Sequence, residues 1–139
     1  RVAVEGAMLG LPEVSLGLIP GFGGTQRLSR LASPGVAREW ILTGDMYSAA
    51  DAMRVGVVNR VASTDDLKEV TIKLASTIAK RGPIAINAAL DVIRRGLEVG
   101  QSEGENLESD AFGLLFTTKD QAEGAEAFLE KRKPNFSGE

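Results

Sequence analysis

Apolar residues recur every three or four positions through most of the chain after residue 64. This spacing places them on one face of a helix that packs against a core. Two series of this kind lie on either side of Gly82-Pro83, where a helix is expected to end. They are Leu67, Val70, Leu74 and Ile78, then Ile86, Leu90, Ile93 and Leu97. Two further helices are predicted after capping boxes formed by Ser102 with Glu105 and by Thr118 with Gln121. The pattern therefore predicts four helices joined by short turns.

Residues 1 to 64 carry shorter patterns and more turn-forming residues. Residues 1–24 are typical of strands and tight turns, and residues 25–31 of a short helix. A helix is expected from Pro34, and a shorter one from a capping box at residues 48–51. Each of these two should end at a glycine, Gly44 and Gly56. Residues 57–61, which are short and rich in valine, predict a strand.

The composition excludes several kinds of chemistry. The 139 residues include no cysteine and no histidine, so thiol nucleophiles, disulfides, Cys/His zinc sites and Ser-His-Asp triads are excluded, and no metal site is expected. Hydrophobic residues make up 43% and charged residues 25%, which is typical of one globular domain or part of one. The net charge of −3 and the short apolar runs predict no nucleic-acid or membrane partner. A cytoplasmic or organelle-matrix location fits this pattern best.

The chain opens on Arg1-Val2-Ala3-Val4, which is typical of the middle of a strand. We therefore expect it to be part of a longer polypeptide.

One carboxylate stands alone in an apolar segment. Glu13 is the only ionisable residue between Met8 and Ile19. Loss of solvation favours the protonated form of a carboxyl group and can prepare it for proton transfer near neutral pH. The alternative is a solvated Glu in the turn after Pro12, which the sequence physics alone favours.

A glycine-rich turn follows, with the sequence Pro-Gly-Phe-Gly-Gly at residues 20–24. Glycines let backbone N–H groups approach a ligand closely, and the start of the next helix adds a partial positive charge. Such a turn can hold an oxyanion, a phosphate or a water, or it can be only a tight connection between strand and helix. It matches neither the dinucleotide fingerprint nor the P-loop.

The segment Gly-Leu-Pro-Glu-Val-Ser-Leu-Gly-Leu-Ile-Pro-Gly-Phe-Gly-Gly-Thr-Gln-Arg-Leu at residues 10–28 closely resembles the enoyl-CoA hydratase/isomerase (crotonase) superfamily. Residues 41–44, 48–52, 56–61, 116–124 and 127–136 are also similar to that family. The resemblance spans nearly the whole chain. The chain looks like the C-terminal half of such an enzyme. It implies an α/β, crotonase-like ββα spiral fold, of which this part is mostly helical with a few short strands. Residues 1–64 would end the spiral core, and residues 65–139 would form the C-terminal helical trimerisation region.

The resemblance also implies roles for particular residues. Glu13 matches the family's catalytic acid/base, and Gly21 matches the glycine beside the reacting water or substrate. By position, Phe112, Phe128 and Lys131 match residues that contact coenzyme A. Phe128 and Lys131 are three residues apart, so a helix would show both on one face. The alternatives are helix packing for the two aromatic residues and a solvated surface charge for Lys131.

The implied activity is hydration of a 2-trans-enoyl-CoA to a 3-hydroxyacyl-CoA, a lyase reaction of fatty acid metabolism. No cofactor is expected, since coenzyme A arrives as the thioester of the acyl-CoA substrate. The family's oxyanion-hole N–H groups and second acid would lie outside this chain, and we expect Glu5 to face solvent instead of supplying that acid. A Δ3,Δ2-enoyl-CoA isomerase and a non-catalytic oligomerisation fragment are the alternatives. We expect a homo-oligomer, either a trimer or a dimer of trimers.

Overall fold

The computed structural model describes all 139 residues, Arg1 to Glu139. They form two compact units, Arg1–Lys73 and Leu74–Glu139, and each is described by itself. The predicted boundary after residue 64 falls ahead of helix α4 (Leu67–Ala79), whereas the two units meet within this helix. The helices are more numerous and longer than the strands, as the sequence predicted.

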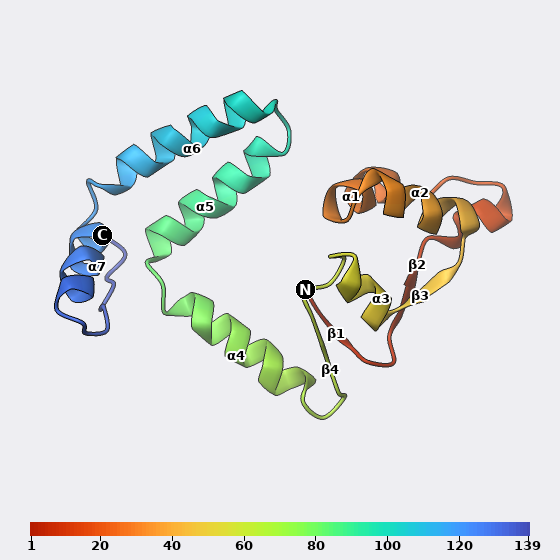
Figure 1. Ribbon diagram of the computed structural model, residues 1–139, viewed down its shortest axis with the longest axis horizontal. Helices are drawn as coiled ribbons and strands as arrows, with labels where there is room; N and C mark the ends of the chain where they lie inside the picture. The colour runs from red at the N-terminus through yellow and green to blue at the C-terminus, as the bar shows by residue number, and fades with distance from the viewer. The chain divides into compact units, whose positions relative to one another are not determined.

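The first unit is made of short strands and short helices (Figure 1). Its elements are β1 (Val2–Val4), β2 (Met8–Gly10), the 3₁₀ helix η1 (Pro12–Leu16), α1 (Gly24–Leu31), α2 (Pro34–Thr43), β3 (Met46–Ser48), α3 (Ala49–Arg54) and β4 (Arg60–Ala62). β1 pairs with β4 in parallel, with Val2 opposite Arg60. β2 pairs with β3 in antiparallel, with Leu9 opposite Tyr47.

The core of this unit lies under α1, α2 and α3. Its buried residues are Leu28, Ala37, Trp40, Ala52, Val57 and Val58. The Trp40 ring stacks on Tyr47, with ring centroids 4.2 Å apart and planes 5° from parallel. This contact joins α2 to β3, and aromatic pairs in such geometry add to the free energy gained by burial.

The predicted strand at residues 57–61 is wrong in its position. The strand is Arg60–Ala62, while the N–H groups of Val57 and Val58 both donate to the carbonyl of Ala52, at 2.8 and 3.1 Å. These bonds fold the two valines back under α3, where both are buried. Their β-branched side chains therefore serve the core and not a sheet.

The second unit is helical. It contains α5 (Pro83–Gly96), α6 (Gln101–Leu115) and α7 (Lys119–Leu129), together with the end of α4. α5 and α6 run alongside each other as a hairpin (Figure 1), and a Cβ atom added to Gly104 would lie 3.6 Å from the Cα of Gly96. Four helices, α4 to α7, therefore follow residue 64 and are joined by short connections, as predicted.

Two capping predictions have different outcomes. The Thr118 hydroxyl accepts the N–H of Gln121 at 3.1 Å, which confirms the predicted start of α7. The Ser102 prediction is wrong, because the N-cap of α6 is Gly100, two positions earlier, and it makes no side-chain cap. Ser102 is already helical, so its hydroxyl cannot take the capping position.

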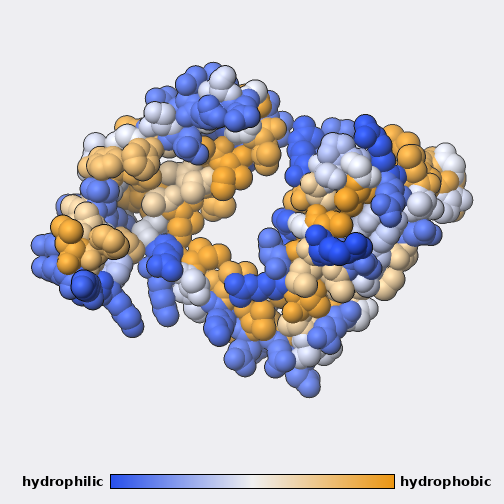
Figure 2. All heavy atoms as spheres, in the orientation of Figure 1, coloured by the Kyte–Doolittle hydropathy of each residue, from blue (hydrophilic) through white to orange (hydrophobic).

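Many large apolar side chains remain at the surface of both units, and Figure 2 shows them as patches among polar residues. Those more than 60% exposed are Leu16, Leu18, Ile19, Phe22, Leu42, Leu90, Ile93, Phe112, Leu114, Phe128 and Leu129. Patches of exposed apolar side chains are characteristic of faces that contact another protein surface or a ligand.

Candidate functional site

Glu13 lies in η1, a short helix fixed at both ends by its sequence. Pro12 occupies the first turn, where a missing N–H does no harm, and Gly17 ends the helix with φ 72°. The N–H of Leu18 donates to the Glu13 carbonyl at 3.1 Å. This bond holds the Glu13 backbone, while the Glu13 side chain makes no hydrogen bond within the chain.

The Oε2 atom of Glu13 is buried and has no hydrogen-bond partner. Buried carboxylate oxygens almost always have a partner, because an unpaired one loses the solvation that water would provide. The side chain as a whole is half-buried. An unsatisfied buried oxygen of this kind calls for an explanation, and a catalytic role is one that would account for it.

The glycine-rich turn brings the chain from η1 to α1. Pro20 is buried, and a Cβ atom added to Gly24 would lie 2.8 Å from the Pro20 Cβ, so the close approach needs glycine. Gly21 is exposed, and nothing lies within 4 Å of where its Cβ would be. Gly21 therefore lies in an open stretch of backbone.

Phe22 sits between Gly21 and Gly23 in a left-handed conformation, with φ 51°. Its side chain is fully exposed, at 101%. A residue with a Cβ costs roughly 1–2 kcal/mol in this conformation, and strain of this kind is commonest at functional positions.

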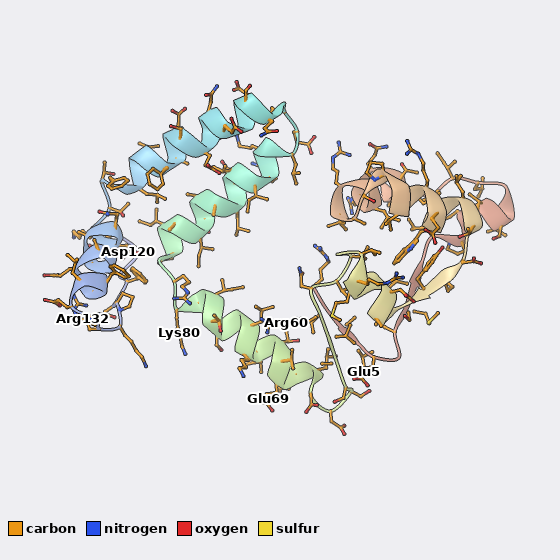
Figure 3. All side chains as sticks on the ribbon, viewed as in Figure 1. Glu5, Arg60, Glu69, Lys80, Asp120 and Arg132 are labelled. Carbon is orange, nitrogen blue, oxygen red and sulfur yellow. The ribbon has the colours of Figure 1, made fainter.

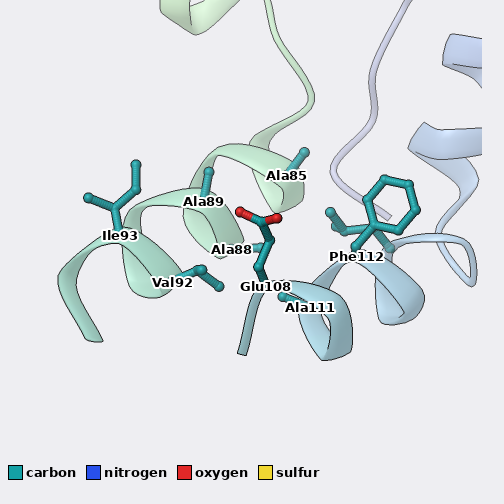
Figure 4. A pocket seen from close by; sticks show the side chains of 9 residues that line it. Ala85, Ala88, Ala89, Val92, Ile93, Glu108, Ala111 and Phe112 are labelled. Atoms are coloured by element: carbon teal, nitrogen blue, oxygen red, sulfur yellow. The ribbon is translucent and has the colours of Figure 1, made fainter. Parts of the chain in front are cut away.

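Phe112 lies on α6, in the second unit. Its ring meets Phe116 edge-on, with centroids 5.2 Å apart, and is 64% exposed. It borders a groove of about 260 Å³ between α5 and α6, with the Glu108 side chain beside it (Figure 4). The rest of the groove is made of alanines and other apolar side chains: Ala85, Ala88, Ala89, Val92, Ile93, Ala111 and Leu115. An apolar groove with a few polar groups is the usual form of a small-molecule site.

The predicted helical face of Phe128 and Lys131 is wrong. α7 ends at Leu129, and Lys131 lies beyond it with φ 57°. Phe128 is 82% exposed in the last turn, and the N–H of Lys131 donates to its carbonyl at 3.2 Å. The two residues are neighbours through this turn and not through helical spacing.

A cluster of charged residues surrounds Arg132, and no pattern in the sequence predicted it. Arg132 is labelled in Figure 3 and contacts the carboxylates of Glu123, Glu126 and Glu130. The Arg132 guanidinium, followed by the N–H of Asn135, lowers the pKa of Glu123 from 4.5 to about 2. Glu123 and Arg132 are nine positions apart, a spacing that no helix places on one face, so no sequence pattern pointed to them.

The C-terminal segment is fastened by a second carboxylate, Asp120 (Figure 3). This side chain is buried, and its oxygens accept the N–H groups of Ser137 at 2.7 Å and Gly138 at 3.1 Å. The tail therefore lies against the start of α7.

Glu13 and Gly21 lie in the first unit, whereas Phe112, Phe128 and Lys131 lie in the second. Glu5 is exposed, in the turn after β1, as predicted. No group of three or more His, Cys, Asp or Glu residues is arranged to hold a metal ion. None of the helices has the length and apolar character needed to cross a membrane.

Several known proteins are similar to this chain in sequence, and one solved structure among them is similar in fold. A crotonyl-CoA hydratase of Syntrophomonas wolfei is 44% identical over 136 residues, which are 98% of this chain and 52% of that protein. A short-chain-enoyl-CoA hydratase of Clostridioides difficile is 44% identical over 128 residues, 92% of this chain and 83% of that protein. The crystal structure of an enoyl-CoA hydratase from Bacillus anthracis matches all of this chain and 54% of its own, with a TM-score of 0.95 and 45% identity.

The chain spans about half the length of most of the curated relatives it matches, for example 52%, 51% and 53% of three of them. The family model for enoyl-CoA hydratase/isomerase matches residues 1–139. The match includes the η1 segment with Glu13, the glycine-rich turn and the helices of the second unit. The chain therefore belongs to the enoyl-CoA hydratase/isomerase family and has the α/β fold of the crotonase superfamily.

Proposed function

We propose that this chain forms the C-terminal half of an enzyme that hydrates 2-trans-enoyl-CoA to 3-hydroxyacyl-CoA, with Glu13 as its acid/base. The observation that carries the proposal is the buried Glu13 Oε2 without a hydrogen-bond partner. The names of the relatives, crotonyl-CoA hydratase and short-chain-enoyl-CoA hydratase, support the same reaction.

In the proposed reaction, water adds across the double bond between Cα and Cβ of the enoyl-CoA. Its hydroxyl group bonds to Cβ, and a proton reaches Cα. Glu13 passes a proton between water and Cα, and a second acid outside this chain assists it. Backbone N–H groups, also outside this chain, stabilise the negative charge that develops on the thioester oxygen. Gly21 lies beside the reacting water.

The second unit supplies contacts to the coenzyme A part of the substrate. Phe112 borders an apolar groove, and the exposed Phe128 ring and the Lys131 ammonium suit a base and a phosphate. No cofactor is needed beyond the coenzyme A of the substrate. Assembly as a trimer or a dimer of trimers through residues 65–133, and a cytoplasmic or organelle-matrix location, belong to the same proposal.

The experiment replaces Glu13 in an active enzyme. A chimera in which this chain replaces its matching segment of the Bacillus anthracis enoyl-CoA hydratase supplies the rest of the site. Glu13→Gln should lower kcat for crotonyl-CoA by roughly 10²–10⁴-fold, because it removes a positioned proton-transfer group. KM should change little, since the amide keeps the shape of the side chain.

The matched control is Glu5→Gln, which removes an exposed carboxylate from the same unit and should leave kcat within a few-fold. Turnover of Glu13→Gln equal to that of Glu5→Gln would remove Glu13 from the mechanism. The isomerase alternative predicts that the chimera shifts the double bond of a 3-enoyl-CoA faster than it hydrates crotonyl-CoA. If the chain is only an oligomerisation fragment, it should assemble normally but release or absorb no heat of binding when acetoacetyl-CoA is titrated in a calorimeter.

A further inference from the structure

Lys131 adopts a conformation in which lysine is seldom found. Its φ is 57°, and it follows the C-cap residue of α7, Glu130. The N–H of Lys131 donates to the Phe128 carbonyl at 3.2 Å, and the N–H of Arg132 donates to the Ala127 carbonyl at 3.0 Å. These two bonds define a Schellman motif, and the position that Lys131 takes in it is usually glycine. A strained residue of this kind persists only where its surroundings hold it.

Glu123 provides that hold. Its two oxygens accept two N–H groups of the Arg132 guanidinium, at 2.6 and 3.0 Å. Its Oε1 also accepts the backbone N–H of Asn135 at 2.7 Å. Glu123 therefore fixes the chain at two points just beyond Lys131, through a bidentate pair and a charge-assisted bond.

Two other carboxylates touch Arg132 but do not do the same. Glu130 accepts from Arg132 Nε at 2.6 Å, and Glu126 lies 3.4 Å from Nη2. Neither contacts the backbone beyond Lys131. The Glu126 side chain is 66% exposed, against 23% for Glu123. Glu126 is thus a matched control, since it carries the same group on the same helix with one weak contact.

We infer that Glu123 is a positioning residue for coenzyme A: through Arg132 and Asn135 it keeps Lys131 in the left-handed turn that bonds its backbone N–H to the Phe128 carbonyl. The inference rests on the proposed contacts of Phe128 and Lys131 with the nucleotide end of the substrate. An aromatic face suits a purine, and an ammonium group suits a phosphate, provided that both stay in one place. Without Glu123 the turn can relax, and the two groups are no longer held together.

The test uses the 139-residue chain labelled for NMR, titrated with coenzyme A and, separately, with pantetheine, which lacks the nucleotide. We expect coenzyme A alone to shift the amide signals of residues 128–131. Glu123→Gln should weaken this binding at least fivefold and speed hydrogen exchange at the Arg132 amide. Glu126→Gln should do neither. Lys131→Gly should raise the thermal midpoint, because it relieves the strain, and should abolish the shifts.

Each outcome decides a different point. If Lys131→Gly abolishes binding but Glu123→Gln binds as Glu126→Gln does, the positioning role is wrong and the nucleotide contact stands. If coenzyme A shifts none of these signals in the unmodified chain, the inference falls with the nucleotide contact, while the Glu13→Gln kinetics still judge the hydratase proposal. Should Glu123→Gln unfold α7, Glu123→Asp keeps the charge at a shorter reach, and unchanged affinity with faster exchange at Arg132 would overturn the inference.

Discussion

Gly44, at the end of α2, packs against η1, the helix that carries Glu13. Replacing Gly44 with alanine should therefore disturb both helices. Gly44 has φ 68° and follows α2 directly. A Cβ atom there would lie 3.0 Å from the Ser15 Oγ and 3.1 Å from the Val14 Cγ2, both in η1. Neighbours this close must move by a few tenths of an ångström, and η1 moves with them.

The size of the effect follows from three contributions. Alanine in the left-handed region costs roughly 1–2 kcal/mol. Alanine also has fewer conformations than glycine in the unfolded chain, which raises the free energy of unfolding by about 0.4–1 kcal/mol. Crowding against η1 adds about 1–2 kcal/mol, as for other overpacked positions. Gly44→Ala should therefore lower the free energy of unfolding by about 2 kcal/mol, or the midpoint temperature by roughly 6–10 °C for a chain of this size.

Gly17→Ala separates backbone strain from crowding. Gly17 has φ 72°, close to that of Gly44, but nothing lies within 4 Å of its added Cβ. This variant should lose about 1 kcal/mol or less, since only the first two contributions remain. Gly35, in the first turn of α2, needs no positive φ, so Gly35→Ala should be neutral or stabilising.

Urea unfolding followed by Trp40 fluorescence measures all three variants, because the single tryptophan is 4% exposed in the core of this unit. A Gly44→Ala chain no less stable than Gly17→Ala would refute the packing of η1 against the end of α2.

Three further predictions concern a helix cap, acid and assembly. Ser48→Ala should lower the free energy of unfolding by about 1 kcal/mol in the same urea assay, because the Ser48 hydroxyl accepts the Asp51 N–H at 3.1 Å. Ser102→Ala, within α6 of the second unit, should stay within about 0.5 kcal/mol when urea unfolding is followed by circular dichroism, which reports on the helices. The pKa of Glu123 is lowered from 4.5 to about 2, so its stabilisation of the tail is complete above about pH 4.5 and fades as the pH falls towards 2. Thermal midpoints in that range should fall more steeply for the unmodified chain than for Glu123→Gln, and parallel curves would contradict this. The exposed apolar residues predict association, so a stable monomer at micromolar concentration in sedimentation would contradict the proposed trimer or dimer of trimers.

Local signals in the sequence located most of the helices. Proline at the start of α2 and α5, glycine after α2 and the Thr118 cap act over three or four residues, so the sequence alone reveals them. The pairing of β2 with β3 was not predicted, because Met46–Ser48 becomes a strand only through contact with Met8–Gly10. The burial of Val57 and Val58 likewise depends on α3 folding over them.

The candidate site divides in the same way. Glu13 stood out because no other ionisable residue is near it in the sequence, whereas the unpaired state of its Oε2 required the fold. The position of Lys131 could not be predicted, since its turn depends on Arg132 contacts with residues up to nine positions earlier. The resemblance to the family supplied the roles, and the structure supplied the neighbours.

The parallel pairing of β1 with β4 has a consequence for how the first unit folds. Val2 and Arg60 are partners although 58 positions separate them, and everything between them must be made before they can meet. At about 5–20 residues per second, a ribosome needs roughly 3–12 s to add that stretch. Closing a flexible loop of this length costs about 3–4 kcal/mol of chain entropy. The edge of β1 therefore stays unpaired for seconds during synthesis, and this strand is where a chaperone or another copy of the chain would first compete with folding.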